Sequence, residues 1–100
     1  MEVNFEDTKR LVNKCAKSVA DVVFCERIGD DELWQKIEDE AEAMAYGYVT
    51  NGLQILASYG WSDALYGGVD REDSPLYQFE EDVHNMVIEL LEGEGIEVYD

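Results

Sequence analysis

The chain has 100 residues, of which 46% are hydrophobic, and a formal net charge of −17. This length fits one domain over residues 1–100 with a modest apolar core, and the hydrophobic content excludes a disordered chain. A negative field of this size repels nucleic acid and anionic membranes, so we expect neither to be bound directly.

The negative charge is concentrated in the second part of the chain. Residues 1–36 contain six basic and eight acidic residues, whereas residues 37–100 contain sixteen acidic residues and Arg71 as the single basic one. A general adaptation to high salt would spread the acids evenly. The asymmetry favours a directional acidic surface that attracts a basic protein partner, although a solvated face that only keeps the protein soluble is the simpler alternative.

Residues 4–28 are predicted to form the first helix, with Asn4 as its cap and Gly29 at its end. Apolar residues recur there at steps of three and four residues or their sum. The predicted core positions are Phe5, Val12, Cys15, Val19 and Val22. Four basic residues lie mostly outside this stripe, and we expect them to pair with the acidic helices: Lys9, Arg10, Lys14 and Lys17.

Both cysteines would lie on this helix. Ten residues separate Cys15 from Cys25, which is about 15 Å along a helix and too far for a disulfide. We therefore expect two reduced, buried thiols, as in a cytoplasmic protein. The N-terminus lacks the apolar region of a signal peptide, and no apolar run is long enough to cross a membrane.

Asp30-Asp31-Glu32 predict the start of a second helix, because acidic residues stabilise the positive end of a helix dipole. Residues 45–61, AYGYVTNGLQILASYGW, are ambiguous, because Asn51-Gly52 between apolar runs also indicates a hairpin. Neither run alternates cleanly between apolar and polar residues, so we favour a helix that is kinked or broken there. Its predicted core positions begin with Trp34, Ile37, Ala41, Met44 and Tyr48.

A short helical turn capped by Ser62 is predicted before the last helix, which begins with Ser74 as N-cap and Pro75 as first residue and ends at Gly93. The tail GEGIEVYD is expected to be a short edge strand or irregular. The expected fold is all-α: a small compact helical bundle of three main helices plus one short helix, with a possible short C-terminal strand. The last helix has the predicted core positions Leu76, Phe79, Val83, Val87, Leu90 and Leu91.

Signals for catalysis or metal binding are weak. His84 is the only histidine, and no nucleophile motif accompanies it, so we expect it at a helix surface or core edge. Residues 70–81, DREDSPLYQFEE, have the acid spacing of a calcium loop, but Pro75 stands where that loop needs glycine. We predict no catalytic residue, no cofactor and no metal.

Two non-enzymatic functions fit these observations. In the first, carboxylates fixed on a rigid scaffold imitate the charge of DNA and block a basic nucleic-acid-binding groove. Small acidic inhibitors from phages and mobile elements act in this way on restriction enzymes and CRISPR effectors, and the present chain is similar to them in size and charge. In the second, an antitoxin-like or adaptor module docks a partner through an aromatic patch.

The predicted partner-binding residues follow from these two hypotheses. Two rows of acids on the long helices and the acidic loop between them would supply the negative surface, and two aromatic residues would supply the patch. The acids are Glu38, Asp39, Glu42, Asp70, Glu72, Asp73, Glu81, Asp82, Glu89 and Glu92, and the aromatic residues are Trp61 and Tyr66.

Overall fold

The computed structural model describes residues 5–23, 25–47 and 74–99, together with Asn51, Ile55 and Tyr59. Three helices dominate the fold: α1 (Phe5–Asp21), α2 (Asp30–Gly47) and α4 (Pro75–Gly93). Two short strands, β1 (Arg27–Gly29) and β2 (Glu97–Tyr99), form a parallel pair. The predicted small helical bundle with a short C-terminal strand is therefore confirmed, while the helical turn predicted at Ser62 lies outside the described residues.

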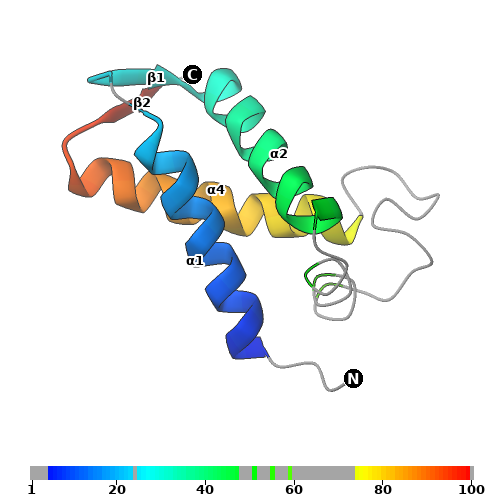
Figure 1. The fold of residues 1–100 in the computed structure, drawn as a ribbon. Helices are drawn as coiled ribbons and strands as arrows, with labels where there is room; N and C mark the ends of the chain where they lie inside the picture. The colour runs from blue at the N-terminus through cyan, green and yellow to red at the C-terminus, as the bar shows by residue number, and fades with distance from the viewer. Residues whose placement is uncertain are drawn as a thin grey trace.

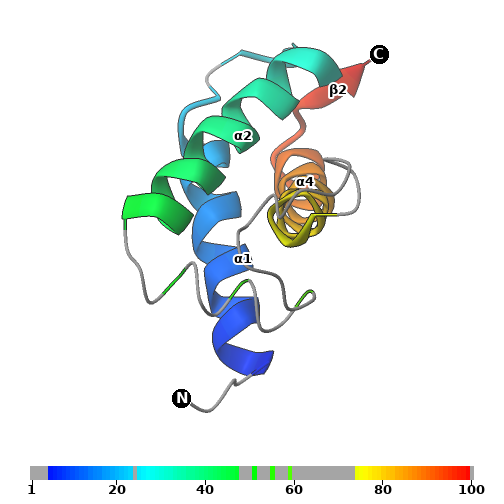
Figure 2. The ribbon, with the colours of Figure 1, turned by 90° about the vertical axis from the view of Figure 1, so that its right-hand side faces the viewer.

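Helices α1 and α2 both pack on α4 and on each other (Figure 1). Seen almost along the axis of α4, they lie on the same side of that helix (Figure 2). The other side of α4 therefore faces away from both. None of the described helices combines the length and the apolar character that a membrane span requires.

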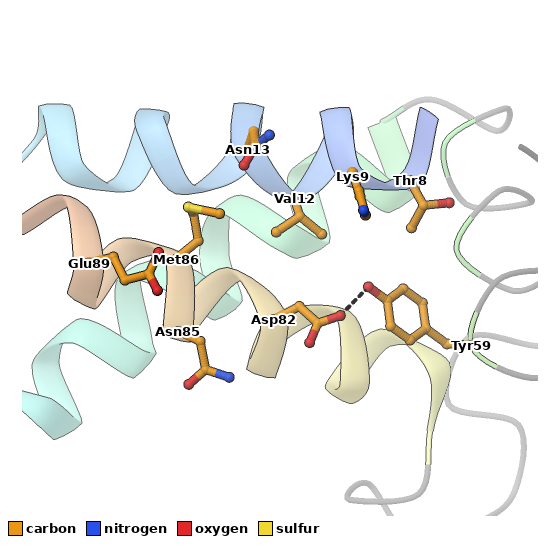
Figure 3. Close-up of a pocket in the computed structure, with 9 residues that line it drawn as sticks. All are labelled: Thr8, Lys9, Val12, Asn13, Tyr59, Asp82, Asn85, Met86 and Glu89. Carbon is orange, nitrogen blue, oxygen red and sulfur yellow. Dashed lines mark hydrogen bonds between the residues drawn. The ribbon is translucent and has the colours of Figure 1, made fainter. Parts of the chain in front are cut away.

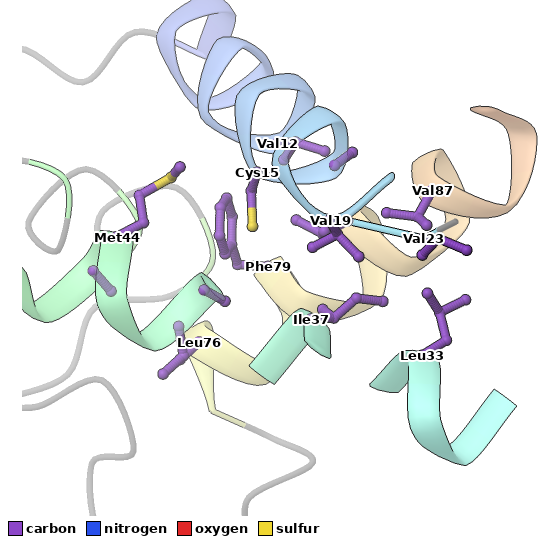
Figure 4. Packing of buried hydrophobic residues seen from close by; sticks show 14 of the residues in the cluster. Val12, Cys15, Val19, Val23, Leu33, Ile37, Met44, Leu76, Phe79 and Val87 are labelled. Atoms are coloured by element: carbon purple, nitrogen blue, oxygen red, sulfur yellow. The ribbon is translucent and has the colours of Figure 1, made fainter. Parts of the chain in front are cut away.

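One apolar core fills the space between the three helices (Figure 4). Phe79 of α4 is fully buried there with Cys15 of α1 and Ile37 of α2. Each large apolar side chain buried in this way contributes about 1.5–3 kcal/mol to folding. The predicted core positions that are confirmed are Val12, Cys15, Val19, Ile37, Ala41, Met44, Leu76, Phe79, Val83, Val87 and Leu91.

Three other predicted core positions are more exposed than expected. Val22 is 52% exposed, because it lies in the turn after α1, and Val23 is buried in its place. Trp34 and Leu90 are only half-buried at the edge of the core. The side chains of Phe5 and Tyr48 lie outside the described part of the chain.

The first helix is shorter than predicted, because α1 ends at Asp21 and residues 27–29 form β1. β-Branched residues such as Val22 and Val23 favour extended backbone over helix. Ile28 is only 2% exposed and pairs with Val98 of β2, a contact that a longer helix would remove. Gly29 therefore precedes α2 instead of ending α1.

The two cysteines lie in different surroundings as a result. Cys15 is buried, and desolvation, with the nearby charges of Glu40 and Glu80, raises the pKa of its thiol to about 12. Cys25 follows α1 and is exposed, so the prediction that it is buried is wrong. Both thiols are free, as predicted.

Both ends of α4 are fixed by hydrogen bonds. At the start, Ser74 Oγ accepts from the Tyr77 backbone N–H at 3.1 Å, which confirms the predicted N-cap. At the end, the Ile96 N–H donates to the Leu91 carbonyl at 2.9 Å and the Gly95 N–H to Glu92 at 3.1 Å. These two bonds form a Schellman motif, which requires the left-handed φ of 81° found at Gly95.

The Schellman turn directs the chain into β2, which lies beside β1. Arg27 Nε contacts Glu97 Oε2 at 3.1 Å, and the Arg27 guanidinium lies 4.7 Å from the centre of the Tyr99 ring. We call this pair of strands the strand clasp. It ties the segment between α1 and α2 to the segment that follows α4.

The hairpin alternative for residues 45–61 receives no support from the described part of that stretch. Asn51, Ile55 and Tyr59 all have helical backbone, and they follow one another at four-residue steps. Ile55 is fully buried, and the Asn51 side-chain amide donates to the Met44 carbonyl. Whether this segment continues α2, which ends at Gly47, lies outside the described residues.

Gly95 and Gly93 provide a matched pair for a stability test. Gly95→Ala should lower the free energy of unfolding by about 1 kcal/mol, because alanine resists a left-handed φ. Gly93→Ala should raise it by roughly 0.5–1 kcal/mol, because that position is helical and an added Cβ meets nothing within 4 Å. Urea unfolding followed by circular dichroism measures both, and effects of the same sign would contradict the turn geometry.

The cysteines should differ in reactivity. With dithionitrobenzoate near pH 8, Cys25 should react at once, whereas Cys15 should react only as the protein unfolds, because its raised pKa keeps the thiol neutral and burial excludes the reagent. Absorbance should therefore report one fast thiol per chain. Cys25→Ser should remove the fast phase, and its persistence in that variant would show that Cys15 is accessible.

Candidate functional site

Charge is divided unequally among the three helices. α2 contains seven acidic residues and one basic residue, and α4 contains five acidic residues and no basic one. α1 contains three acidic and four basic residues. The negative charge of the described helices therefore lies on α2 and α4, and α1 is almost neutral.

Four carboxylates of α4 form what we call the acidic ridge: Glu81, Asp82, Glu89 and Glu92, all exposed. They lie away from the side of α4 that buries Val83. At 100° per residue, Glu81 and Glu92 project within about 20° of each other, and so do Asp82 and Glu89. The predicted single row is thus two stripes, of which the Asp82–Glu89 stripe lies towards α1.

The predicted acids of α2 differ in exposure and direction. Asp39 and Glu42 are exposed, Glu38 is half-buried, and the Gln35 side-chain amide donates to Asp39 Oδ1 at 3.2 Å. Glu38 follows Trp34, which contacts α4, by one helical turn. Helical geometry therefore places Glu38 on the α4 side of α2 and Asp39 further from it.

Five of the predicted partner-binding residues lie outside the described part of the chain. They belong to the acidic loop and to the aromatic patch of the alternative hypothesis. They are Asp70, Glu72, Asp73, Trp61 and Tyr66.

Three of the four basic residues of α1 do not form the ion pairs with the acidic helices that we predicted. Lys9, Lys14 and Lys17 are exposed, and none forms an ion pair with any residue that the structure describes. Arg27 instead forms an exposed ion pair with Glu97 in the strand clasp. No ion pair therefore joins Lys9, Lys14 or Lys17 to a carboxylate of the acidic ridge.

An aromatic cluster joins α2 to α4. The Trp34 ring stacks on His84 with centroids 4.3 Å apart and is nearly parallel to Tyr77 at 5.9 Å. His84 Nε2 lies 2.7 Å from Asp30 Oδ1 in the first turn of α2. This cluster fixes the start of α2 against the middle of α4.

His84 is held between an aromatic ring and a carboxylate. Its side chain is 14% exposed, at the edge of the core as predicted, and it contacts the Trp34 ring and the Asp30 carboxylate. The Cys15 thiol, with its raised pKa, is neutral at physiological pH and a poor nucleophile. Among the residues the structure describes, no cluster of histidine, cysteine and acidic side chains could hold a metal ion.

A groove lies between α1 and α4, on the α1 side of the acidic ridge (Figure 3). Its volume is about 590 Å³. At one end the Tyr59 hydroxyl donates a short hydrogen bond to Asp82 Oδ2. Burial and this carboxylate raise the pKa of the Tyr59 phenol above its ordinary value. The groove is lined by Thr8, Lys9, Val12, Asn13, Tyr59, Asp82, Asn85, Met86 and Glu89.

Sequence reasoning missed both the aromatic cluster and the groove. The seven-residue step from Tyr77 to His84 places both on one helix face, and this signal could have indicated the cluster. No local signal indicates the groove, because its two walls are far apart in the sequence.

No protein-family model matches this chain, and no curated protein or solved structure shows significant similarity to it.

The contact between Asp30 and His84 can be tested against a neighbouring acid. Asp30→Asn should lower the free energy of unfolding by about 1 kcal/mol relative to Asp31→Asn, because it weakens a partly buried, charge-assisted hydrogen bond. Asp31 is exposed in the same turn, so its variant measures the general effect of removing one charge from an acidic helix. Equal unfolding free energies in the two variants would show that the contact does not stabilise the fold.

Proposed function

We propose that this protein is a non-enzymatic inhibitor that occupies a basic nucleic-acid-binding groove of another protein by imitating the charge of DNA. The observation that carries the proposal is the segregation of charge: the acidic ridge of α4 and the exposed acids of α2 lie on the described surface, and Lys9, Lys14 and Lys17 of α1 form no ion pair with them. The fitting targets are cytoplasmic nucleic-acid enzymes of the kind that phages and mobile elements inhibit, including restriction enzymes and CRISPR effectors.

The way the carboxylates are held supports the proposal. The backbone of α4 is fixed by the apolar core on one side, by the Ser74 cap and by the Schellman turn. Carboxylates on a fixed backbone lose less conformational entropy on binding than those of a flexible acidic tail. A rigid acidic surface can therefore compete with DNA, whose phosphates are also fixed in position.

The spacing of the carboxylates indicates how much of a DNA surface the ridge can imitate. From Glu81 to Glu92 the ridge spans about 16 Å of helix axis, and it carries four carboxylates over that length. DNA carries one charge per about 1.7 Å, so the ridge is less densely charged than a duplex. It corresponds to the few phosphates that a cluster of lysines and arginines contacts directly, and α2 carries the further exposed acids Asp39 and Glu42.

The test compares two variants that lose the same charge. The ridge variant replaces Glu81, Asp82, Glu89 and Glu92 with their amides, and the control variant replaces the exposed acids Asp21, Glu26, Glu32 and Glu94. A basic nucleic-acid-binding protein captured at low ionic strength serves as the target. The ridge variant should bind it about 30-fold more weakly, since four surface charges contribute roughly 0.5 kcal/mol each, and the control much less.

Competition and salt then decide between the hypotheses. A duplex DNA should displace the protein from the target, and binding should weaken steeply as salt rises from about 50 to 200 mM. Simultaneous binding of DNA and this protein to the target would overturn the proposal. If Trp61→Ala or Tyr66→Ala weakens binding more than the ridge variant does, the protein is instead an interaction module that docks through aromatic residues.

A further inference from the structure

The groove between α1 and α4 has an apolar floor and a polar rim. Val12 of α1 is buried, Met86 of α4 is half-buried, and the two side chains lie between the helices (Figure 3). Asp82 and Glu89 border the groove on the α4 side and Lys9 on the α1 side. A ligand that fits it must therefore combine an apolar body with a charged or polar end.

The rim leaves acceptors available to such a ligand. Asp82 already accepts from Tyr59, which leaves its other oxygen. Glu89 and Asn85 make no hydrogen bond or ion pair with any residue that the structure describes. Glu89 therefore offers a whole carboxylate at the mouth of the groove, with a side-chain amide one turn before it.

The sign of the charge selects a cation. Two carboxylates face one ammonium group across the groove, and Glu81 and Glu92 lie on the same helix just outside it. An anion would meet this negative field, whereas a cation is attracted by it. Lys9 repels a cation locally, so the groove attracts a cation less strongly than its two carboxylates alone would.

We infer that the groove receives an arginine side chain of the basic partner, with its methylene stem on Val12 and Met86 and its guanidinium on Glu89. This inference rests on the proposed function and names the chemistry by which the ridge would be recognised. A guanidinium carries five N–H donors and is weakly hydrated, so it can bond Glu89 and reach Asn85, one helical turn away, as well. The stem is long enough to cover apolar surface while the charge stays at the rim, and methionine adapts to such a stem.

The test uses the methionine methyl groups as reporters. The chain has three methionines, of which Met86 lines the groove and Met44 is buried in the core. In protein labelled with ¹³C at the methionine methyl groups, the peptide acetyl-Gly-Arg-Gly-amide at low salt should shift the Met86 signal saturably and leave the Met44 signal unchanged. The same peptide with citrulline, which is nearly isosteric and neutral, should produce no shift. A Met86→Leu variant assigns the signal.

Three single-charge variants should change the affinity for the arginine peptide by different amounts and in different directions. Glu89→Gln should weaken the arginine peptide about fivefold, Glu81→Gln, outside the groove, should weaken it by less than about twofold, and Lys9→Gln should strengthen it about twofold. Each variant is compared with the native chain by thermal melting, so that a loss of fold is not read as a loss of binding.

The inference and the proposed function fail in different ways. An unchanged Met86 signal, equal effects of Glu81→Gln and Glu89→Gln, or an equal shift with the citrulline peptide would overturn the inference. None of these results would contradict the proposed DNA mimicry, which the ridge variant and the competition with DNA test separately. If instead the arginine peptide binds as expected but the target holds DNA and this protein together, the groove is established and DNA mimicry is wrong.

Discussion

The apolar face of α4 is the constraint on which the arrangement of charge depends. Phe79, Val83 and Val87 are fully buried on that face, and both α1 and α2 pack on it. A rotation of α4 by one residue, about 100°, would turn an acid of the ridge towards the core, where an uncompensated charge costs several kcal/mol. The buried residues therefore fix the direction in which the carboxylates of the ridge face.

Concentrated like charge costs stability, and the scaffold offsets part of that cost. The Trp34–His84 stack and its Asp30 contact join the two acidic helices, α2 and α4, which otherwise repel each other. The strand clasp adds a second connection at the end of the bundle. An acidic residue is also found in the core. Glu80 is fully buried in α4, and its charge contributes to the raised pKa of the Cys15 thiol.

Local signals predicted the parts of the fold that local interactions determine. Ser74-Pro75 marked the start of α4, and Asp30-Asp31-Glu32 marked that of α2, because capping and dipole interactions act within one turn. The predicted end of α1 was wrong because β1 forms only through its pairing with β2, at the other end of the chain. The aromatic cluster and the groove depend likewise on how helices cross. Spacing alone could therefore predict that the ridge is exposed, but not that Asp82 and Glu89 border a groove.

The strand clasp also bears on how the molecule is made. It pairs Arg27 with Glu97 and so closes a loop of about 70 residues, which is slow to form compared with contacts within a helix. On the ribosome, α1 and α2 emerge well before α4 and β2. Until those later segments arrive, Ile28 lacks its strand partner and the faces of α1 and α2 that pack on α4 are uncovered, so they offer a transient binding surface to chaperones.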